Sequence, residues 1–216
     1  LGFATTTYDR EGEEADPRGE APACDHELLT GLEQRFSGTF DQVPPPYSAK
    51  KVDGKKLYEL ARSGQKIKIE PKSVTVHQLS LKSEREAEID LTVEASTGFY
   101  VRSLAHDIGG ALECGGYLHH LCRLAIGPYN LANALPQKAL ETAEDPEEIT
   151  DSDAWIPLGK IALPFPDLAL NAAAVDRFTH GQEVVVLRPG SETIEVDEQV
   201  VIRSPTGDIK IGRASW

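Results

Sequence analysis

The stretch "EAEIDLTVEASTGFYVRSLAHDIGGAL", residues 86–112, changes its hydrophobic period half-way along. From Ala87 to Ala95 every odd position is apolar and every even position is polar or acidic, which predicts a half-buried antiparallel strand. After a turn at Thr97 and Gly98, apolar residues recur at intervals of three and four, which predicts a helix. We therefore expect an α/β (α+β) fold with a mixed, largely antiparallel sheet flanked by helices.

Tyr100 and Arg102 stand where this strand gives way to the helix. Two residues apart on an extended backbone point to the same side, which would bring the phenol and the guanidinium together. Because of the turn at Gly98, the alternation of the preceding strand does not determine which side of the sheet Tyr100 and Arg102 would face. Taken alone, such a pair is more often a half-buried tyrosine beside a surface arginine than part of a site.

The remaining pattern predicts further elements. Strands are expected at residues 1–7, after residue 37 and at 67–76, and helices at 25–36, with Asp25 as the N-cap, and at 117–126. Residues 7–22 and the acidic run 141–153 read as loops. A short strand with a turn at Asp53 and Gly54 is expected to lead into a helix that ends at Gly64. Short strands are expected beyond residue 165, including 175–187, so the domains are placed at 1–160 and 161–216.

Charge is distributed unevenly along the chain. The 216 residues carry a formal charge of −13, which argues against a nucleic-acid partner if it is taken as an average. Residues 50–72, however, hold eight basic and three acidic side chains, whereas residues 141–153 hold seven acidic and none. The basic segment is therefore the part of the chain suited to phosphates, although charge runs are usually only solvated faces.

Three cysteines, an odd number, fit reduced thiols in the cytosol better than a disulfide framework. Cys114, His119, His120 and Cys122 do not complete a zinc-ligand pattern, so no metal is expected. No run of eighteen apolar residues is present, and the N-terminal residues lack the regions of a signal peptide. A cytoplasmic protein without a membrane partner is expected.

Two long motifs carry a family resemblance. "PPPYSAKKVDGKKLYELARSG" at 44–64 and "GFYVRSLAHDIGGALECGGYLHHLCRLAIGPY" at 98–129 resemble the TruB-type pseudouridine synthases, which modify uridine 55 in the T-loop of tRNA. The opening "LGFATTTYDREG" is also similar to that family, with Thr6 where an aspartate is common. The resemblance covers residues 1 to about 135 closely, and the C-terminal part loosely, as a small all-β PUA-like RNA-binding domain.

The resemblance implies site residues and partners. Tyr100 would pack against the flipped base, Arg102 would pair with the catalytic aspartate, and Leu121 would close the pocket. RNA-binding roles are implied for Lys50, Lys51, Lys55, Lys56, Tyr58 and Arg123. The partner would be the T-arm of tRNA, with no cofactor and with a monomeric protein.

One departure from the family concerns its catalytic aspartate, which lies in a "GHTGTLDP"-like segment that has no match in these 216 residues. Neither Asp9 nor Asp107 matches that position. The simplest interpretation is an N-terminally truncated synthase whose chain is inactive by itself. The alternatives are a non-catalytic RNA-binding scaffold of the same fold and a synthase of the guide-RNA branch, which the segment 46–62 fits less well.

Overall fold

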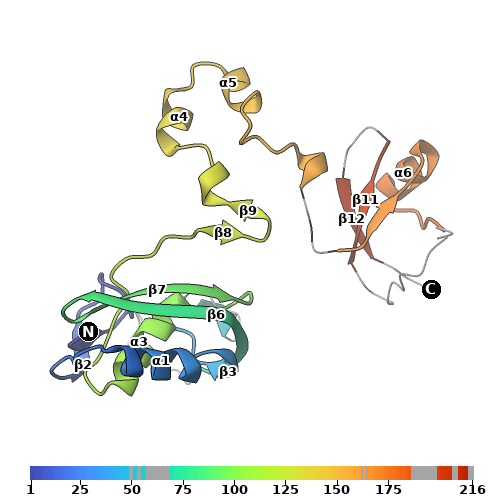
Figure 1. Ribbon diagram of the computed structural model, residues 1–216. Coiled ribbons are helices and arrows are strands. Elements are labelled where there is room, and N and C mark those ends of the chain that lie inside the picture. Colours follow the sequence, from blue (N-terminus) through green and yellow to red (C-terminus); the bar gives the residue numbers. More distant parts are fainter. Residues whose placement is uncertain are drawn as a thin grey trace. The chain divides into compact units, whose positions relative to one another are not determined.

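A computed structural model describes residues 1–48, 51–52, 55–56, 69–161, 163, 165–185, 199–205 and 209–213. The chain forms two compact units, Leu1–Cys122 and Arg123–Trp216. Each unit has its own cluster of buried hydrophobic side chains. Figure 1 shows the helices and strands of both units. The expected boundary at residue 160 stays a prediction. Among the described residues, no helix combines the length and apolar character needed to cross a membrane.

The first unit is built on a three-stranded antiparallel sheet in the order β3-β6-β7. β6 pairs with β3 on one side and with β7 on the other. A β1–β2 hairpin and a short β4–β5 hairpin accompany the sheet. The described elements of this unit are β1 Phe3–Thr5, β2 Glu14–Arg18, α1 His26–Arg35, β3 Gly38–Gln42, β4 Lys51–Val52, β5 Lys55–Lys56, β6 Lys72–Arg85, β7 Glu88–Ala95 and α3 Val101–Ala111.

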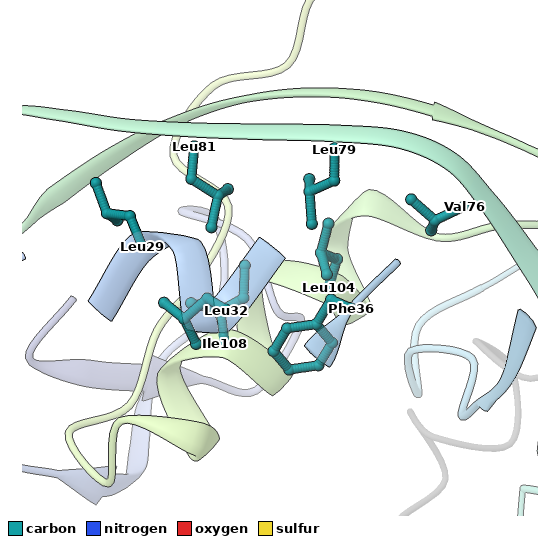
Figure 2. Packing of buried hydrophobic residues seen from close by; sticks show 8 residues of the cluster. All are labelled: Leu29, Leu32, Phe36, Val76, Leu79, Leu81, Leu104 and Ile108. Atoms are coloured by element: carbon teal, nitrogen blue, oxygen red, sulfur yellow. The ribbon is translucent and has the colours of Figure 1, made fainter. Parts of the chain in front are cut away.

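The core of this unit lies between one face of the sheet and the helices α1 and α3. Figure 2 shows that the apolar side chains of β6 point toward the two helices. Leu104 of α3 is fully buried at the centre of the cluster. Burying one such side chain contributes about 1.5–3 kcal/mol, so the cluster fixes both helices against β6. Its buried members are Leu29, Leu32, Phe36, Val76, Leu79, Leu81, Leu104 and Ile108.

Local signals in the sequence explain α1 and β7. The Asp25 side chain accepts a hydrogen bond from the Leu28 backbone N–H, which caps α1 as expected. Along β7 the polar residues are exposed and the apolar residues are half-buried, which confirms the predicted alternation. The Glu33 carboxylate of α1 also accepts a hydrogen bond from the Leu81 N–H at 2.6 Å, so helix and strand are joined by a polar contact as well.

Glycines allow a very close approach at the C-terminal end of α3. A Cβ on Gly109 would lie 2.1 Å from the backbone nitrogen of Gly116. A Cβ on Gly115, whose φ is +79°, would lie 2.2 Å from the Pro17 carbonyl. The chain after α3 therefore packs directly on the helix and on the β1–β2 hairpin, and no larger residue fits at either position.

The second unit holds a small mixed sheet in the order β10-β11-β12. β10 is parallel to β11, and β12 is antiparallel to it. A cluster centred on Leu170, Val200 and Ile202 includes the half-buried Phe178 of α6. The described elements are β8 Ala125–Ile126, β9 Tyr129–Asn130, 3₁₀ turns at Leu131–Asn133 and Leu158–Lys160, α4 Gln137–Thr142, α5 Pro146–Thr150, β10 Asp167–Ala169, α6 Ala172–Thr179, β11 Gln199–Arg203 and β12 Ile209–Arg213.

Two predicted elements are wrong in opposite directions, one an expected helix and the other an expected strand. Residues 117–124 are not helical, because the Leu118 N–H donates to the Tyr8 carbonyl and the Leu118 carbonyl accepts from Arg10 N–H. Residues 172–179 were expected to be partly strand but form α6. The side chain of Asn171 caps this helix by accepting a hydrogen bond from Ala174 N–H, and its apolar face packs on the Leu170 cluster.

Other boundaries differ in smaller ways. Part of the expected loop 7–22 is strand β2, because it pairs with β1. The acidic run contains α5, which begins with the capping residue Asp145 and with Pro146 in the first turn. β6 begins at Lys72, residues 69–71 before it are not in a strand, and residues 67 and 68 of the expected strand lie outside the described residues. Lys55 and Lys56 form a strand rather than the start of a helix. The predicted helix that ends at Gly64 lies outside the described residues.

The glycine contacts predict opposite effects for two neighbouring substitutions. Gly109→Ala should destabilise the protein by about 3 kcal/mol, because the new Cβ meets backbone that cannot move cheaply. Gly110→Ala, one residue further along α3 in open space, should be neutral or stabilise by up to about 1 kcal/mol. Thermal unfolding followed by circular dichroism measures both. Equal unfolding temperatures for the two variants would contradict the packing described here.

Candidate active site

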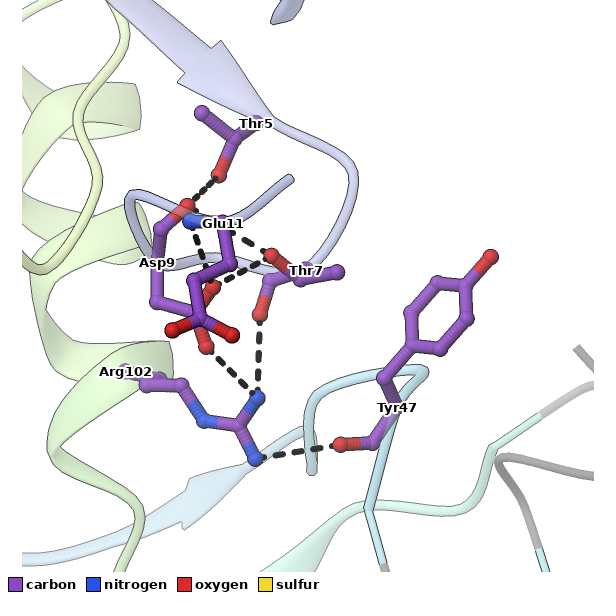
Figure 3. A network of polar contacts seen from close by, with 6 residues as sticks. All are labelled: Thr5, Thr7, Asp9, Glu11, Tyr47 and Arg102. Atoms are coloured by element: carbon purple, nitrogen blue, oxygen red, sulfur yellow. Dashed lines mark hydrogen bonds and ion pairs between the residues drawn. The ribbon is translucent and has the colours of Figure 1, made fainter. Parts of the chain in front are cut away.

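The Arg102 guanidinium joins three segments of the first unit (Figure 3). Arg102 lies in the first turn of α3, and its Nη1 donates to Oδ2 of Asp9 at 3.0 Å and to the Thr7 carbonyl at 3.3 Å. Nη2 donates to the Tyr47 carbonyl at 3.0 Å. The side chains of Arg102 and Asp9 are 27% and 26% exposed, so this ion pair is better shielded than an ordinary surface pair.

The carboxylate of Asp9 is enclosed by its own turn. Its Oδ1 accepts hydrogen bonds from the Thr7 hydroxyl at 2.5 Å and from the Glu11 N–H at 3.2 Å. The Asp9 carbonyl accepts from the Thr5 hydroxyl at 2.7 Å. Both carboxylate oxygens are therefore bonded, and the turn holds the charge that faces Arg102.

The segment after β3 runs along the start of α3. The fully buried Ser103 donates its hydroxyl hydrogen to the Val43 carbonyl at 2.7 Å, one residue before Pro44. Gln42 makes two hydrogen bonds to the backbone of Tyr100. With the contact of Arg102 to the Tyr47 carbonyl, residues 42–47 are attached to the start of α3 through three of its residues; we call this segment the strap. Its prolines restrict its backbone further.

The chain after α3 returns to the turn that holds Asp9. Leu118 forms an isolated parallel β-bridge with Asp9. Arg10 N–H donates to the Leu118 carbonyl, and Leu118 N–H donates to the Tyr8 carbonyl. This bridge lies three residues before Leu121, so the segment that carries Leu121 leaves from the Asp9 turn.

Titratable side chains with shifted pKa values lie beside Asp9. The Tyr8 ring stacks on the His106 ring of α3, with ring centres 3.8 Å apart and planes 9° apart. Burial lowers the pKa of His106, whereas burial and then the charge of Asp107 raise the pKa of Tyr8. Burial also raises the pKa of the Asp107 carboxyl to about 6, and the charge of Arg35 opposes that rise. The stack places an aromatic contact next to the ion pair.

The structure places some of the predicted site residues together. Tyr100 is the N-cap of α3 and has an extended backbone, so it directly precedes the helical turn that carries Arg102. Leu121 is 54% exposed and belongs to the first unit, whereas the exposed Arg123 begins the second. The roles assigned to Tyr100, Arg102 and Leu121 remain predictions.

Three of the predicted RNA-binding lysines, Lys51, Lys55 and Lys56, belong to the β4–β5 hairpin. Its register pairs Lys51 with Lys56 and Val52 with Lys55. Lys50 and Tyr58 lie outside the described residues. Their assignment to RNA binding remains a prediction that rests on sequence.

Two residues of this arrangement were not predicted. The sequence suggests Asp9 only as a possible nucleophile, which it does not match, and it gives no reason to single out Gln42. The Asp9 carboxylate accepts from the Glu11 N–H two residues on, an Asx turn that an aspartate followed by a glycine-containing loop can signal locally. Gln42, the last residue of a strand that continues into three prolines, gives no comparable signal, because its partner is 58 residues away.

Other surface features do not suggest a second centre. An open groove of about 500 Å³ between α1 and the end of α3 is lined by Asp25, Glu27 and one cation, Arg35, among its charged residues. Such a lining does not suit a polyanion. Within the described part of the chain, no three His, Cys, Asp or Glu side chains gather closely enough to hold a metal ion.

Comparison with known proteins identifies the family. Residues 1–101 match the sequence model of the N-terminal domain of the TruB family pseudouridylate synthases. The chain is 42% identical over 185 residues to tRNA pseudouridine synthase B of Burkholderia mallei (strain NCTC 10247), an alignment that covers 85% of this chain and 59% of that protein. The chain belongs to the TruB family.

A more distant TruB relative agrees. The chain is 35% identical over 188 residues to tRNA pseudouridine synthase B of Aquifex aeolicus (strain VF5), with 86% of this chain and 63% of that protein covered. The chain thus spans about three fifths of the length of these relatives.

Solved structures share the fold. A chain in the crystal structure of a Cbf5–Nop10–Gar1 complex is similar with a TM-score of 0.67 at 21% identity, over 91% of this chain and 57% of that chain. A chain in a structure of an H/ACA RNP bound to a substrate RNA containing 2'-deoxyuridine gives a TM-score of 0.63 at 18% identity, over 91% and 56% of the two chains. These likenesses and the antiparallel sheet confirm the expected fold class. The PUA-like assignment stays a prediction.

The raised pKa of Asp107 predicts a pH-dependent effect on stability. A folded-state pKa of about 6 exceeds the ordinary 3.8, so this carboxyl lowers stability progressively as pH rises from 3.8 to about 6, and the loss is complete above that. Asp107→Asn removes that cost and should raise the unfolding temperature at pH 7.5. The gain should shrink as pH falls and vanish near pH 4.

Asp41→Asn, which changes an exposed carboxyl on β3, controls for the loss of one negative charge. Thermal unfolding between pH 4 and 8 measures both variants. If Asp107→Asn shifted the unfolding temperature equally at every pH, the pKa of Asp107 would not be raised in the folded protein.

Proposed function

We propose that this chain supplies part of the catalytic site of a tRNA pseudouridine-55 synthase, which isomerises uridine 55 in the T-loop of tRNA. The observation that carries the proposal is the position of Arg102, which is fastened to Asp9 and Tyr47 at the start of α3 in a chain 42% identical to a tRNA pseudouridine synthase B. The identities of 35–42% to proteins of that name favour the stand-alone enzyme over the guide-RNA branch.

The reaction requires the base to move. The bond between N1 of the uracil and C1' of the ribose breaks, the base rotates, and a bond forms between C5 and C1'. The proton on C5 is lost and N1 gains one, so the product is an isomer of the substrate. Because these atoms are inaccessible in a stacked loop, the nucleotide must be extruded into a pocket.

Three residues take roles in this proposal. Tyr100 supplies an aromatic face for the extruded base, which replaces the lost stacking. Arg102 orients the catalytic carboxylate through the planar fork of its guanidinium, and its existing contacts hold that fork in place. The exposed Leu121 closes the pocket from the segment that leaves the Asp9 turn.

RNA binding is assigned to the basic segment and its neighbours. Residues 50–72 have eight basic and three acidic side chains in a chain of charge −13, which makes them the part best suited to a polyanion. The β4–β5 register sets Lys51 opposite Lys56. Lys50, Lys55, Tyr58 and Arg123 complete the proposed contacts, and the T-arm of tRNA is the proposed ligand.

The second candidate function is a non-catalytic RNA-binding scaffold of the same fold. A scaffold needs the basic segment but has no use for a guanidinium held in one orientation at the start of α3. The well-bonded geometry of Arg102 therefore favours the enzyme. Turnover separates the two candidates directly.

Tritium release tests the proposed activity. The complete product of the gene that encodes this chain should release tritium from a T-arm RNA that carries [5-³H]uridine at position 55. Arg102→Lys should lower the rate by about one to three orders of magnitude, because a single ammonium cannot reproduce the two-nitrogen fork. Arg85→Lys, an exposed arginine of β6 paired with Glu88, is the matched control and should keep its rate.

RNA that binds without tritium release would support the scaffold instead. Equal rates for Arg102→Lys and Arg85→Lys would remove Arg102 from the site.

Salt dependence tests the basic segment. Changing Lys50, Lys55 and Lys56 to Gln should weaken T-arm binding and reduce the slope of log K against log salt by about 2 to 3, at about 0.7–0.9 for each lost phosphate contact. The control changes the same charge elsewhere, at Lys82, Lys138 and Lys160, all of which are exposed. Filter binding from low to moderate salt gives both slopes. If the two triple variants behave alike, the lysines of the hairpin do not contact phosphate.

A further inference from the structure

We propose that Gln42 is a positioning residue for the site at the start of α3: its side-chain amide fixes the backbone of Tyr100, and through it the directions of the Tyr100 ring and the Arg102 guanidinium. The inference rests on the proposed function for its effect on catalysis. The contact itself is independent of that function.

The contact is reciprocal and buried. Oε1 of Gln42 accepts a hydrogen bond from the Tyr100 N–H at 2.8 Å, and Nε2 donates to the Tyr100 carbonyl at 3.1 Å. Gln42 is 2% exposed. One planar amide therefore satisfies the donor and the acceptor of the same residue, as a neighbouring strand would.

Tyr100 needs such a partner because of its place in the chain. Its backbone is extended, with φ −113° and ψ 108°, and its side chain makes no capping hydrogen bond to α3. Its carbonyl also accepts the first hydrogen bond of the helix, from Leu104 N–H at 3.1 Å. Any rotation of this peptide would change the direction of the Tyr100 side chain and would tilt the first turn, where Arg102 lies.

The sheet in turn holds Gln42. It is the last residue of β3 and pairs with Lys72 of β6, whose apolar residues form the core. The strap then continues to the contacts with Ser103 and Arg102. The packed sheet thus fixes the position of the Gln42 amide, and this amide fixes the backbone of Tyr100, the residue proposed to contact the base. Displacements of about 1 Å in such a chain can cost about a hundredfold in rate.

Ser103 offers a matched control. It is as buried as Gln42 and also joins α3 to the strap, through its bond to the Val43 carbonyl. It makes no described contact with the backbone of Tyr100. If Gln42 contributed only to general stability, Gln42→Met and Ser103→Ala would behave alike at a temperature where both are folded.

The experiment compares these two variants with the unchanged protein in the complete gene product. Single-turnover tritium release should fall about ten- to a hundredfold in Gln42→Met and less than about threefold in Ser103→Ala. The dissociation constant for T-arm RNA should stay within about threefold in both. Amide hydrogen exchange at Tyr100, measured by NMR, should speed up in Gln42→Met only.

A third variant, Gln42→Glu, adds a pH readout. A protonated carboxyl can donate to the Tyr100 carbonyl and accept from its N–H, whereas a carboxylate can only accept. Burial favours the protonated form. The rate of this variant relative to the unchanged protein should therefore rise as pH falls, which loss of packing would not produce.

Three outcomes would overturn the inference: an unchanged rate in Gln42→Met, an unchanged exchange rate at Tyr100, or an equal loss of rate in Ser103→Ala. If the unchanged protein released no tritium, the proposed function would fail and with it the catalytic part of the inference. The exchange measurement would still decide whether Gln42 holds Tyr100.

Discussion

The attachment of the first turn of α3 to two distant segments is the constraint on which the proposed site depends. Arg102 reaches Asp9, 93 residues away in the chain, and the Tyr47 carbonyl, 55 residues away. Gln42 adds the strap to the same turn. Because a guanidinium can serve several acceptors in fixed directions, one side chain sets the mutual positions of the Asp9 turn, the strap and the helix. Removing it would break the contacts that this side chain makes with the Asp9 turn and the strap.

This polar attachment works only because the apolar core first brings the segments together. The leucines and valines of β6 fix α1 and α3 on one face of the sheet, and Gly109 and Gly116 let the chain after α3 turn back against the helix. That return brings Leu118 to the Asp9 turn. The site therefore lies at one end of α3, while its supports extend along the whole helix.

The sequence predicted what is encoded locally. The alternation of β7, the capped helix α1 and the apolar face of α3 follow from neighbouring residues, and the structure confirms them. The expected helix at 117–126 is wrong because the backbone of Leu118 is used in pairing with residues 8–10, a contact across more than a hundred residues. The prediction that a helix starts at Lys55 and Lys56 is wrong for the same kind of reason, because the backbones of these residues pair with β4.

The family resemblance indicates Tyr100, Arg102 and Leu121 as site residues. It does not indicate Asp9, which binds Arg102, or Gln42, which binds the backbone of Tyr100. Asp9 was visible only as an acid in a turn, and Gln42 as a polar residue at the end of a strand. Their functions depend on partners 93 and 58 residues away, which no local pattern specifies.

The most direct measurement is a crystal structure of the complete gene product with a T-arm RNA that carries 5-fluorouridine at position 55. In this nucleotide fluorine replaces the C5 hydrogen that must leave as a proton to complete the reaction. The account predicts that the modified base lies extruded against the Tyr100 ring, next to Leu121, with Arg102 still bonded to Asp9 and the Tyr47 carbonyl and Gln42 still bonded to Tyr100. A base that stays stacked in its loop, or that binds away from the start of α3, would contradict it.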